Sequence, residues 1–351
     1  MSERSKELAS AAPAAWWQWL DDARLFIRLP ALGFTLLLPL LGSASVWPVL
    51  DGRLLVGLLC AAVCFHNFSY VLNDVVDLPI DRTQPQRAHY PLVRGRISAV
   101  QALAFALLQY PLALLVTWWL RGSEAVYAWL TAAFVLMGIY DVWGKRFFYP
   151  PLTDIAQGVG WAALVFYGAL LVQQEVVVLT ILLAAFIAGF ITLLNGVHAS
   201  LRDLDNDLQW GLRTTAIVLG ARPRSPVGQE LPRRLLIYTV VGQLLIGGLL
   251  VWPVVGNLTA DGRGLQFGKL AAVGVIVLWS SYLTYRIVQP QRTAAEIGEE
   301  TLRFILISNI ALFIPFIGFV TVSTFALMLL CGLGPTLLWY VLNWLRPFAL
   351  K

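Results

Sequence analysis

The chain has 351 residues, of which 58% are hydrophobic and 13% are charged. A soluble globular domain is about one-quarter charged, so this composition excludes such a domain and predicts an all-α integral membrane protein. The formal net charge of +5 does not indicate a nucleic-acid partner, because the basic residues follow the predicted membrane topology.

Apolar segments long enough to cross a lipid bilayer, which takes about 20 residues, recur along the chain. We expect membrane spans at residues 30–50, 53–76, 98–120, 124–141, 152–173, 176–202, 234–255, 267–288, 303–321 and 324–345. The last two could form one broken unit, so the count is nine or ten. Residues 1–23 are assigned to a polar N-terminal tail, 24–345 to a single transmembrane domain and 346–351 to a short C-terminal tail.

The basic residues give the chain an orientation. With ten spans, all but four of the 25 Lys and Arg residues fall on the N-terminal side of the membrane. The exceptions are Arg53, Arg121, Arg263 and Lys269. The positive-inside rule places the side rich in Lys and Arg in the cytoplasm. The longest loops, 77–97 and 203–233, lie on that side.

Two acidic clusters lie at the ends of apolar spans on the same side. The first contains Asn73, Asp74, Asp77 and Asp81, and the second contains Asp203, Asp205 and Asp207. On insertion scales an Asp at the centre of a membrane helix costs roughly 2.5–3.5 kcal/mol. Several carboxylates in such segments therefore indicate a functional site with an opening toward the cytoplasm.

Helical geometry groups these carboxylates. At about 100° per residue, Asp74, Asp77 and Asp81 fall within an arc of about 60°. Asp203 and Asp207 lie about 40° apart, whereas Asp205 points nearly opposite. Pro79 loosens the helix, so Asp81 is expected on the following turn.

Unpaired carboxylates this close repel one another and take up protons, and Mg²⁺ resolves the repulsion. Magnesium prefers oxygen ligands and is commonly held by one or two carboxylates together with substrate phosphates. The two clusters facing each other could each hold Mg²⁺ and share one diphosphate. Basic side chains on the same side are available to grip its oxygens: Arg28, Arg94, Lys145, Arg202 and Arg213.

These residues resemble the UbiA superfamily of intramembrane prenyltransferases. The first cluster is similar to the family's N-D-x-x-D-x-x-x-D signature, and residues 91–98 are similar to its P-L-x-x-G-x-I-S pattern, with Tyr90 where the family has Arg. The second signature is similar to residues 202–216. Tyr140 and Lys145 look like the family's Tyr and Lys after the fourth span, and Arg28 resembles its Arg before the first.

The resemblance implies nine or ten transmembrane helices around a central cavity. It also implies Mg²⁺-dependent transfer of a prenyl group from a polyprenyl diphosphate to an acceptor, often aromatic, with release of diphosphate. The expected catalytic residues are Asp74, Asp77, Asp203 and Asp207. The expected metal ligands are these four and Asp81. The expected substrate-binding residues are Asn73, Lys145, Arg28, Arg94, Arg202 and Tyr140.

Two alternatives remain open. A membrane-integral terpene cyclase of the same superfamily would ionise the same substrate but trap the cation internally. A cation-coupled transporter would use the acids as an ion path, although acids at span ends beside basic loops favour a phosphate ligand. The identity of the acceptor, the prenyl chain length and the oligomeric state are not determined by the sequence.

Overall fold

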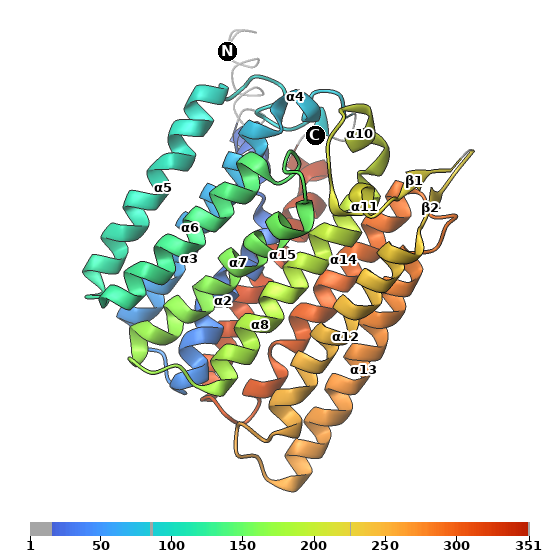
Figure 1. Cartoon of the computed structure of the whole chain (residues 1–351). Helices are drawn as coiled ribbons and strands as arrows, with labels where there is room; N and C mark the ends of the chain where they lie inside the picture. The colour runs from blue at the N-terminus through green and yellow to red at the C-terminus, as the bar shows by residue number, and fades with distance from the viewer. Residues whose placement is uncertain (1–15, 85–86, 225, 350–351) are drawn as a thin grey trace, which may run out of the picture.

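The computed structural model describes residues 16–84, 87–224 and 226–349. Long helices lie side by side and short elements gather mainly at one end (Figure 1). The long helices are α2 (Leu29–Val46), α3 (Gly52–Val76), α5 (Ala99–Trp119), α6 (Glu124–Trp143), α7 (Pro150–Val172), α8 (Val178–Leu193), α12 (Arg233–Val255), α13 (Arg263–Ile287), α14 (Ala294–Ala311) and α15 (Val322–Ala349). Residues 16–23, the described part of the segment that we assigned to the tail, are also helical.

The short elements connect these helices. They are α4 (Leu78–Asp81), the π-helix η2 (Leu194–Ala199), α9 (Ser200–Arg202), α10 (Leu204–Gln209), α11 (Thr215–Val218), the 3₁₀ helix η3 (Ile314–Phe316) and the antiparallel strands β1 (Arg222–Pro223) and β2 (Gln229–Glu230). α4, α10 and α11 lie at the same end of the bundle, at the top of Figure 1. We call this the acidic end, because its elements carry Asp74, Asp77, Asp81, Asp203 and Asp207.

Nine helices in the described part of the chain are long and apolar enough to cross a membrane. They confirm the predicted all-α membrane fold. The sixth span runs through α8, η2 and α9 as one unit, residues Val178–Arg202. Large apolar side chains cover the outside of the bundle, as expected for a surface that contacts lipid; among them are Leu107, Trp118, Leu244, Leu278 and Trp344.

The region predicted as a span at 303–321 has a different form. Helix α14 begins at Ala294, before the predicted span. Charged residues such as Glu296 and Glu300 make α14 more polar than the nine apolar helices. Its first turns are at the acidic end, where Gly298 lies beside the Arg202 side chain. At the other end the Thr321 N–H donates to the Pro48 carbonyl, just after α2 (3.2 Å). Helix α14 and η3 therefore carry the chain back across the bundle as a broken tenth crossing.

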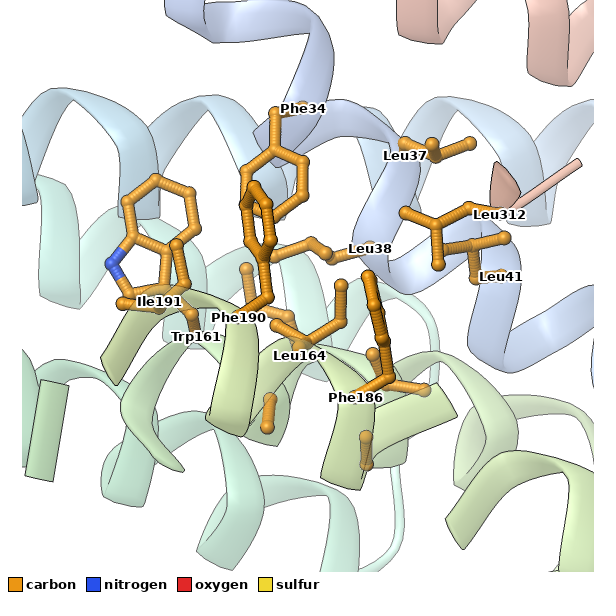
Figure 2. Packing of buried hydrophobic residues seen from close by; sticks show 14 of the residues in the cluster. Phe34, Leu37, Leu38, Leu41, Trp161, Leu164, Phe186, Phe190, Ile191 and Leu312 are labelled. Atoms are coloured by element: carbon orange, nitrogen blue, oxygen red, sulfur yellow. The ribbon is translucent and has the colours of Figure 1, made fainter. Parts of the chain in front are cut away.

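Aromatic and branched side chains pack between the helices. Figure 2 shows Phe34 of α2, Trp161 of α7 and Phe190 of α8 in one buried cluster. The ring centroids of Phe34 and Trp161 are 5.5 Å apart, a distance typical of aromatic pairs. Glycine allows α2 and α7 to approach closely, since a Cβ on Gly168 would lie 1.9 Å from the Pro39 carbonyl oxygen.

Candidate active site

The first acidic cluster lies where α3 breaks. Helix α3 ends at Val76, and the Asp77 N–H still donates to the Asn73 carbonyl (2.9 Å). Pro79 lies in the first turn of α4, a position that suits its fixed φ and missing N–H. The predicted loosening of the helix is therefore present, and Asp81 falls on the separate turn α4. Asp74 and Asp81 are buried, and Asp77 is partly exposed.

The second cluster follows an irregular helix. The π-helical turn η2 and the short α9 precede Asp203, whose backbone leaves helical geometry (φ −98°, ψ 8°) before α10 begins. Such π-helical turns occur often at functional sites. In α10, Asp207 is buried and Asp205 is exposed, as the helical geometry of the sequence predicted.

Lys145 connects the two clusters. Its Nζ donates to Asp77 Oδ2 at 3.0 Å and lies 3.8 Å from Asp207 Oδ1. The segments also meet directly, because Trp210 Nε1 donates to Thr83 Oγ1 (3.1 Å). The Arg213 N–H donates to the Lys145 carbonyl (2.8 Å) and so fixes the loop that carries the lysine. The clusters predicted from sequence therefore lie at one end of the bundle, within reach of a single ammonium group.

Arginine side chains pair with the three remaining acids, which are Asp74, Asp81 and Asp203. Arg28 forms an ion pair with Asp74 and stacks over the Tyr70 ring (5.0 Å). Its backbone is left-handed (φ 46°), a strained conformation for a non-glycine residue and one often retained at functional sites. Arg87 Nε lies 3.9 Å from Asp81 Oδ1.

Arg202 forms a two-pronged pair with its sequence neighbour. Its Nε and Nη2 donate to the two carboxylate oxygens of Asp203 at 2.9 and 2.7 Å. Bidentate geometry of this kind is typical of arginine with carboxylates and phosphates. Arg202 is therefore placed at the cluster with its charge already oriented toward an acid group.

The electrostatics of the acids differ. Burial favours a raised pKa for Asp203, but the hydrogen bonds from Arg202 outweigh it and hold the pKa below its usual range. Burial raises the pKa of Asp81, and it raises the pKa of Asp207 to about 7. Burial also lowers the pKa of Lys145, but Asp77 and Asp207 together raise it above its ordinary value. The site thus contains an excess of carboxylate groups, several of which are buried away from water.

Arg94, expected at the substrate, pairs elsewhere. It forms an ion pair with Asp22, which also accepts from Arg96 Nε at 2.9 Å. Arg87 is instead the arginine of this loop that reaches the acids, and its guanidinium lies over the Tyr90 ring (4.8 Å). Tyr90 stands where the family pattern has Arg, so Arg87 supplies a positive charge beside that position.

Two small cavities lie on either side of Tyr140 and Lys145, which line both. The first is also lined by Asn73, Asp77 and Asp141, and the second by Asp203, Asp207 and Asn195, among others. A larger cavity of about 570 Å³ adjoins the second cluster. Its lining includes Arg87, Tyr90, Arg202 and Asp203. Arg87 and Arg202 thus border an open space that can admit a ligand.

Sequence reasoning missed several polar residues at these cavities. Asp141 and Asp154 are buried acids within predicted spans, and Asn195 and Thr214 line the second cavity. The signal was available for the acids, because an Asp near the end of an apolar span is the same pattern that identified Asp74. Asn195 carries no such signal, since neutral polar residues are common in membrane helices. Thr214 falls within residues 202–216, which resemble the second signature, but no role was assigned to it.

The donor set fits a magnesium ion that is shared with a ligand. Among the described residues, no three His, Cys, Asp or Glu side chains are close enough to hold a metal ion by themselves. Magnesium does not require such a cage, because it commonly takes one or two carboxylates, several waters and phosphate oxygens. The Oδ1 atom of Asp207 is buried and has no hydrogen-bond partner, which leaves an oxygen for a cation.

Comparisons with known proteins identify the family of this chain. The UbiA prenyltransferase family model matches residues 31–295. The 4-hydroxybenzoate octaprenyltransferase of Tolumonas auensis is 27% identical over 241 residues, which cover 68% of this chain and 81% of that protein. Digeranylgeranylglyceryl phosphate synthase of Pyrococcus abyssi is 30% identical over 151 residues, 43% of this chain and 51% of that protein.

Solved structures share the fold. A UbiA homologue from Aeropyrum pernix has a TM-score of 0.63 at 18% identity and covers 82% of this chain and 97% of its own. A UbiA homologue from Archaeoglobus fulgidus bound to DMAPP and Mg²⁺ has a TM-score of 0.56 at 16% identity, covering 83% and 99%. The match of the family model over most of the sequence, with this shared fold, shows that the chain belongs to the UbiA prenyltransferase family.

Proposed function

We propose that this prenyltransferase binds a polyprenyl diphosphate at the acidic end, with Mg²⁺, and transfers the prenyl group to an aromatic acceptor. The observation that carries this proposal is the contact of Lys145 with both acidic clusters. A diphosphate bound there would contact the carboxylates of both clusters through Mg²⁺. It would also contact the ammonium group of Lys145 directly. Cleavage of the bond between the prenyl carbon and the diphosphate oxygen releases diphosphate and leaves an allylic cation. The acceptor carbon attacks this cation and then loses a proton.

The residues divide by role. Asp74, Asp77, Asp81, Asp203 and Asp207 would hold the metal. When bound, Mg²⁺ neutralises charge that develops on the leaving oxygens. Lys145, Arg28 and Arg202 bind the diphosphate oxygens, because fixed cations offset the excess of carboxylates. Asn73 and Tyr140 line the first cavity and orient the ligand. Arg87 takes the loop position that we first assigned to Arg94.

An aromatic path leads from the site into the bundle. Arg28 stacks on Tyr70, whose ring centroid is 6.0 Å from that of Trp161. Trp161 in turn stacks on Phe34. Aromatic faces stabilise a nearby cation, and a dry apolar surround protects it from water. We therefore place the first carbon of the prenyl chain near Tyr70, whose ring is backed by this buried aromatic cluster.

The aromatic class of acceptor is favoured by the relatives. The Tolumonas auensis protein, which aligns over most of this chain, is a 4-hydroxybenzoate octaprenyltransferase. The Pyrococcus abyssi relative is a digeranylgeranylglyceryl phosphate synthase, but it aligns over less than half of the chain. A phenolic acceptor such as 4-hydroxybenzoate is therefore the first to test. The distribution of Lys and Arg supports a site on the cytoplasmic face.

The test is a product assay with purified protein in lipid nanodiscs. Prenyl diphosphates of several lengths are supplied with Mg²⁺, with or without 4-hydroxybenzoate, and products are identified by mass spectrometry. We expect a prenylated aromatic product and equimolar diphosphate, both abolished by EDTA and restored by Mg²⁺. A cyclised hydrocarbon formed equally without acceptor would assign a terpene cyclase instead. Diphosphate release that continues at full rate in EDTA would overturn the metal-dependent proposal.

A further inference from the structure

Asp141 is an acid of the site for which the proposed function has no role. It lies in the last turns of α6, which ends at Trp143. Its side chain is buried, with 5% of the residue exposed, and neither carboxylate oxygen has a hydrogen-bond partner. It lines the first cavity together with Asn73, Asp77 and Lys145. An unpartnered carboxylate thus lines a cavity beside the first acidic cluster and Lys145.

The surroundings of Asp141 contain no cation assigned to it. In residues 16–84, 87–224 and 226–349, the structure records no ion pair for Asp141. The nearest charges include Asp77 and Asp74, and the Arg28 guanidinium is already paired with Asp74. Lys145 donates to Asp77. The other acids of the first cluster, by contrast, each have a basic partner.

A buried carboxylate without a partner is costly. Desolvation of an ionised carboxylate is strongly unfavourable unless a cation or hydrogen bonds compensate. The neighbouring acids increase that cost by repulsion. Asp154 illustrates the alternative, because it is equally buried but accepts a hydrogen bond from the Thr215 hydroxyl. Asp154 has a hydrogen-bond donor within the protein, whereas both carboxylate oxygens of Asp141 are left open to a ligand.

We propose that Asp141 is an oxygen ligand of the divalent cation at the first acidic cluster, shared with Asn73 and Asp77, outside the two sequence signatures. This inference rests on the proposed function and deepens it. Magnesium suits the position, because it is a hard cation that selects carboxylate and carbonyl oxygens. The amide oxygen of Asn73 and the carboxylates of Asp77 and Asp141 line the same cavity and provide such atoms.

The first test measures cation binding without turnover. Mn²⁺, used in place of Mg²⁺, is titrated into purified protein with a non-hydrolysable prenyl thiolodiphosphate, and free Mn²⁺ is followed by electron paramagnetic resonance. We expect Asp141→Asn to weaken Mn²⁺ binding on the order of 10–100-fold, because even outer partners of metal ligands have effects of that size. Glu124→Gln is the matched control, since it removes an exposed acid at the opposite end of the same helix.

The outcomes separate this inference from the proposed function. If Asp77→Asn weakens Mn²⁺ binding and Asp141→Asn leaves it unchanged, Asp141 is not a ligand and the proposed function stands. If the wild-type protein with the diphosphate analogue binds no Mn²⁺, the magnesium assignment itself falls. Retention of Tm and of monodispersity in the Asp141→Asn variant shows that the loss is not one of folding.

A second test distinguishes direct ligation from a general effect of charge. Thiolate is a soft ligand that favours Cd²⁺ over Mn²⁺. Asp141→Cys is therefore expected to lose Mn²⁺ affinity and to bind Cd²⁺ at least about tenfold more tightly than Asp141→Ser does. Equal Cd²⁺ affinity of the Cys and Ser variants would overturn direct ligation. Cys60, Cys64 and Cys331 are common to both variants and cancel in the comparison.

Discussion

Two lysines lie at opposite ends of the bundle, Lys269 in a structural charged cluster and Lys145 in the candidate active site. Lys269 of α13 donates to Asp261 Oδ2 (2.6 Å), Thr259 Oγ1 (3.2 Å) and the Pro315 carbonyl (3.0 Å). Its side chain is 1% exposed and all three of its donors are used. Lys145 donates to Asp77 only, and its side chain is 29% exposed.

The difference assigns the two lysines different roles. The Lys269 cluster is complete within the protein, so it stabilises the turn between α12 and α13 and leaves nothing for a ligand. Lys145 keeps donors available beside acids that are in excess, so it is ready to bind an anion that arrives with a cation. Saturation of the hydrogen-bonding groups, rather than the presence of charge, separates the two ends.

The largest expected effect is on the acids of the site. Asp74→Asn or Asp203→Asn should reduce transfer by at least about 10²-fold, because each removes a proposed metal ligand and the charge stabilisation that would follow from it. Transfer is measured by mass spectrometry, and folding by gel filtration and thermal unfolding. Full turnover in both variants would refute the metal assignment.

Lys269→Met should act on stability instead. Removal of one partner from a buried ion pair leaves the other charge uncompensated and costs about 3–5 kcal/mol. We expect a clear drop in Tm with unchanged affinity for prenyl diphosphate per folded molecule. A Lys269→Met protein with normal Tm and weakened diphosphate binding would reverse the comparison between the two ends.

Lys145→Ala should show the opposite pattern. The hydrogen bond of a charged group contributes about 1.5–3 kcal/mol, which corresponds to a roughly 10–100-fold weaker apparent affinity for the prenyl diphosphate. The Tm should change little, because the lysine is partly exposed and incompletely paired. An unchanged affinity would remove Lys145 from the site.

A smaller effect distinguishes two arginines of one loop. Arg87→Ala should weaken diphosphate binding several-fold, since Arg87 lies at Asp81 and lines the large cavity. Arg94→Ala is the matched control and should leave binding unchanged, because Arg94 pairs with Asp22. Titration of each variant with the thiolodiphosphate analogue measures both values. Equal losses in the two variants would show that the loop acts only through its total charge.

The sequence predicted the spans and the two acidic clusters because their signals are local. Hydropathy locates a span within a window of about 20 residues, and the spacing of Asp74, Asp77 and Asp81 is visible in eight residues. Pairings across the fold are not local. Arg28 reaches Asp74, 46 residues away, and Arg94 is drawn to Asp22 instead of the substrate site.

The crossing predicted at 303–321 begins earlier in the structure, at Ala294, for a related reason. Helix α14 carries acidic residues such as Glu300 that pair with Arg286 of α13 (2.8 Å). Such a pair allows a polar helix to lie inside the bundle. Hydropathy alone does not detect the pair, so it excludes the acidic turns from the predicted span. Asp141 shows the same limit, because only the structure reveals that its carboxylate has no partner.

The most direct test of the account is a structure of the protein in lipid with Mg²⁺ and a prenyl thiolodiphosphate. We expect the diphosphate between Asp77 and Asp207, with an oxygen within hydrogen-bonding distance of Lys145 and the prenyl chain directed toward Tyr70. A diphosphate bound away from Lys145, or in contact with only one acidic cluster, would contradict it.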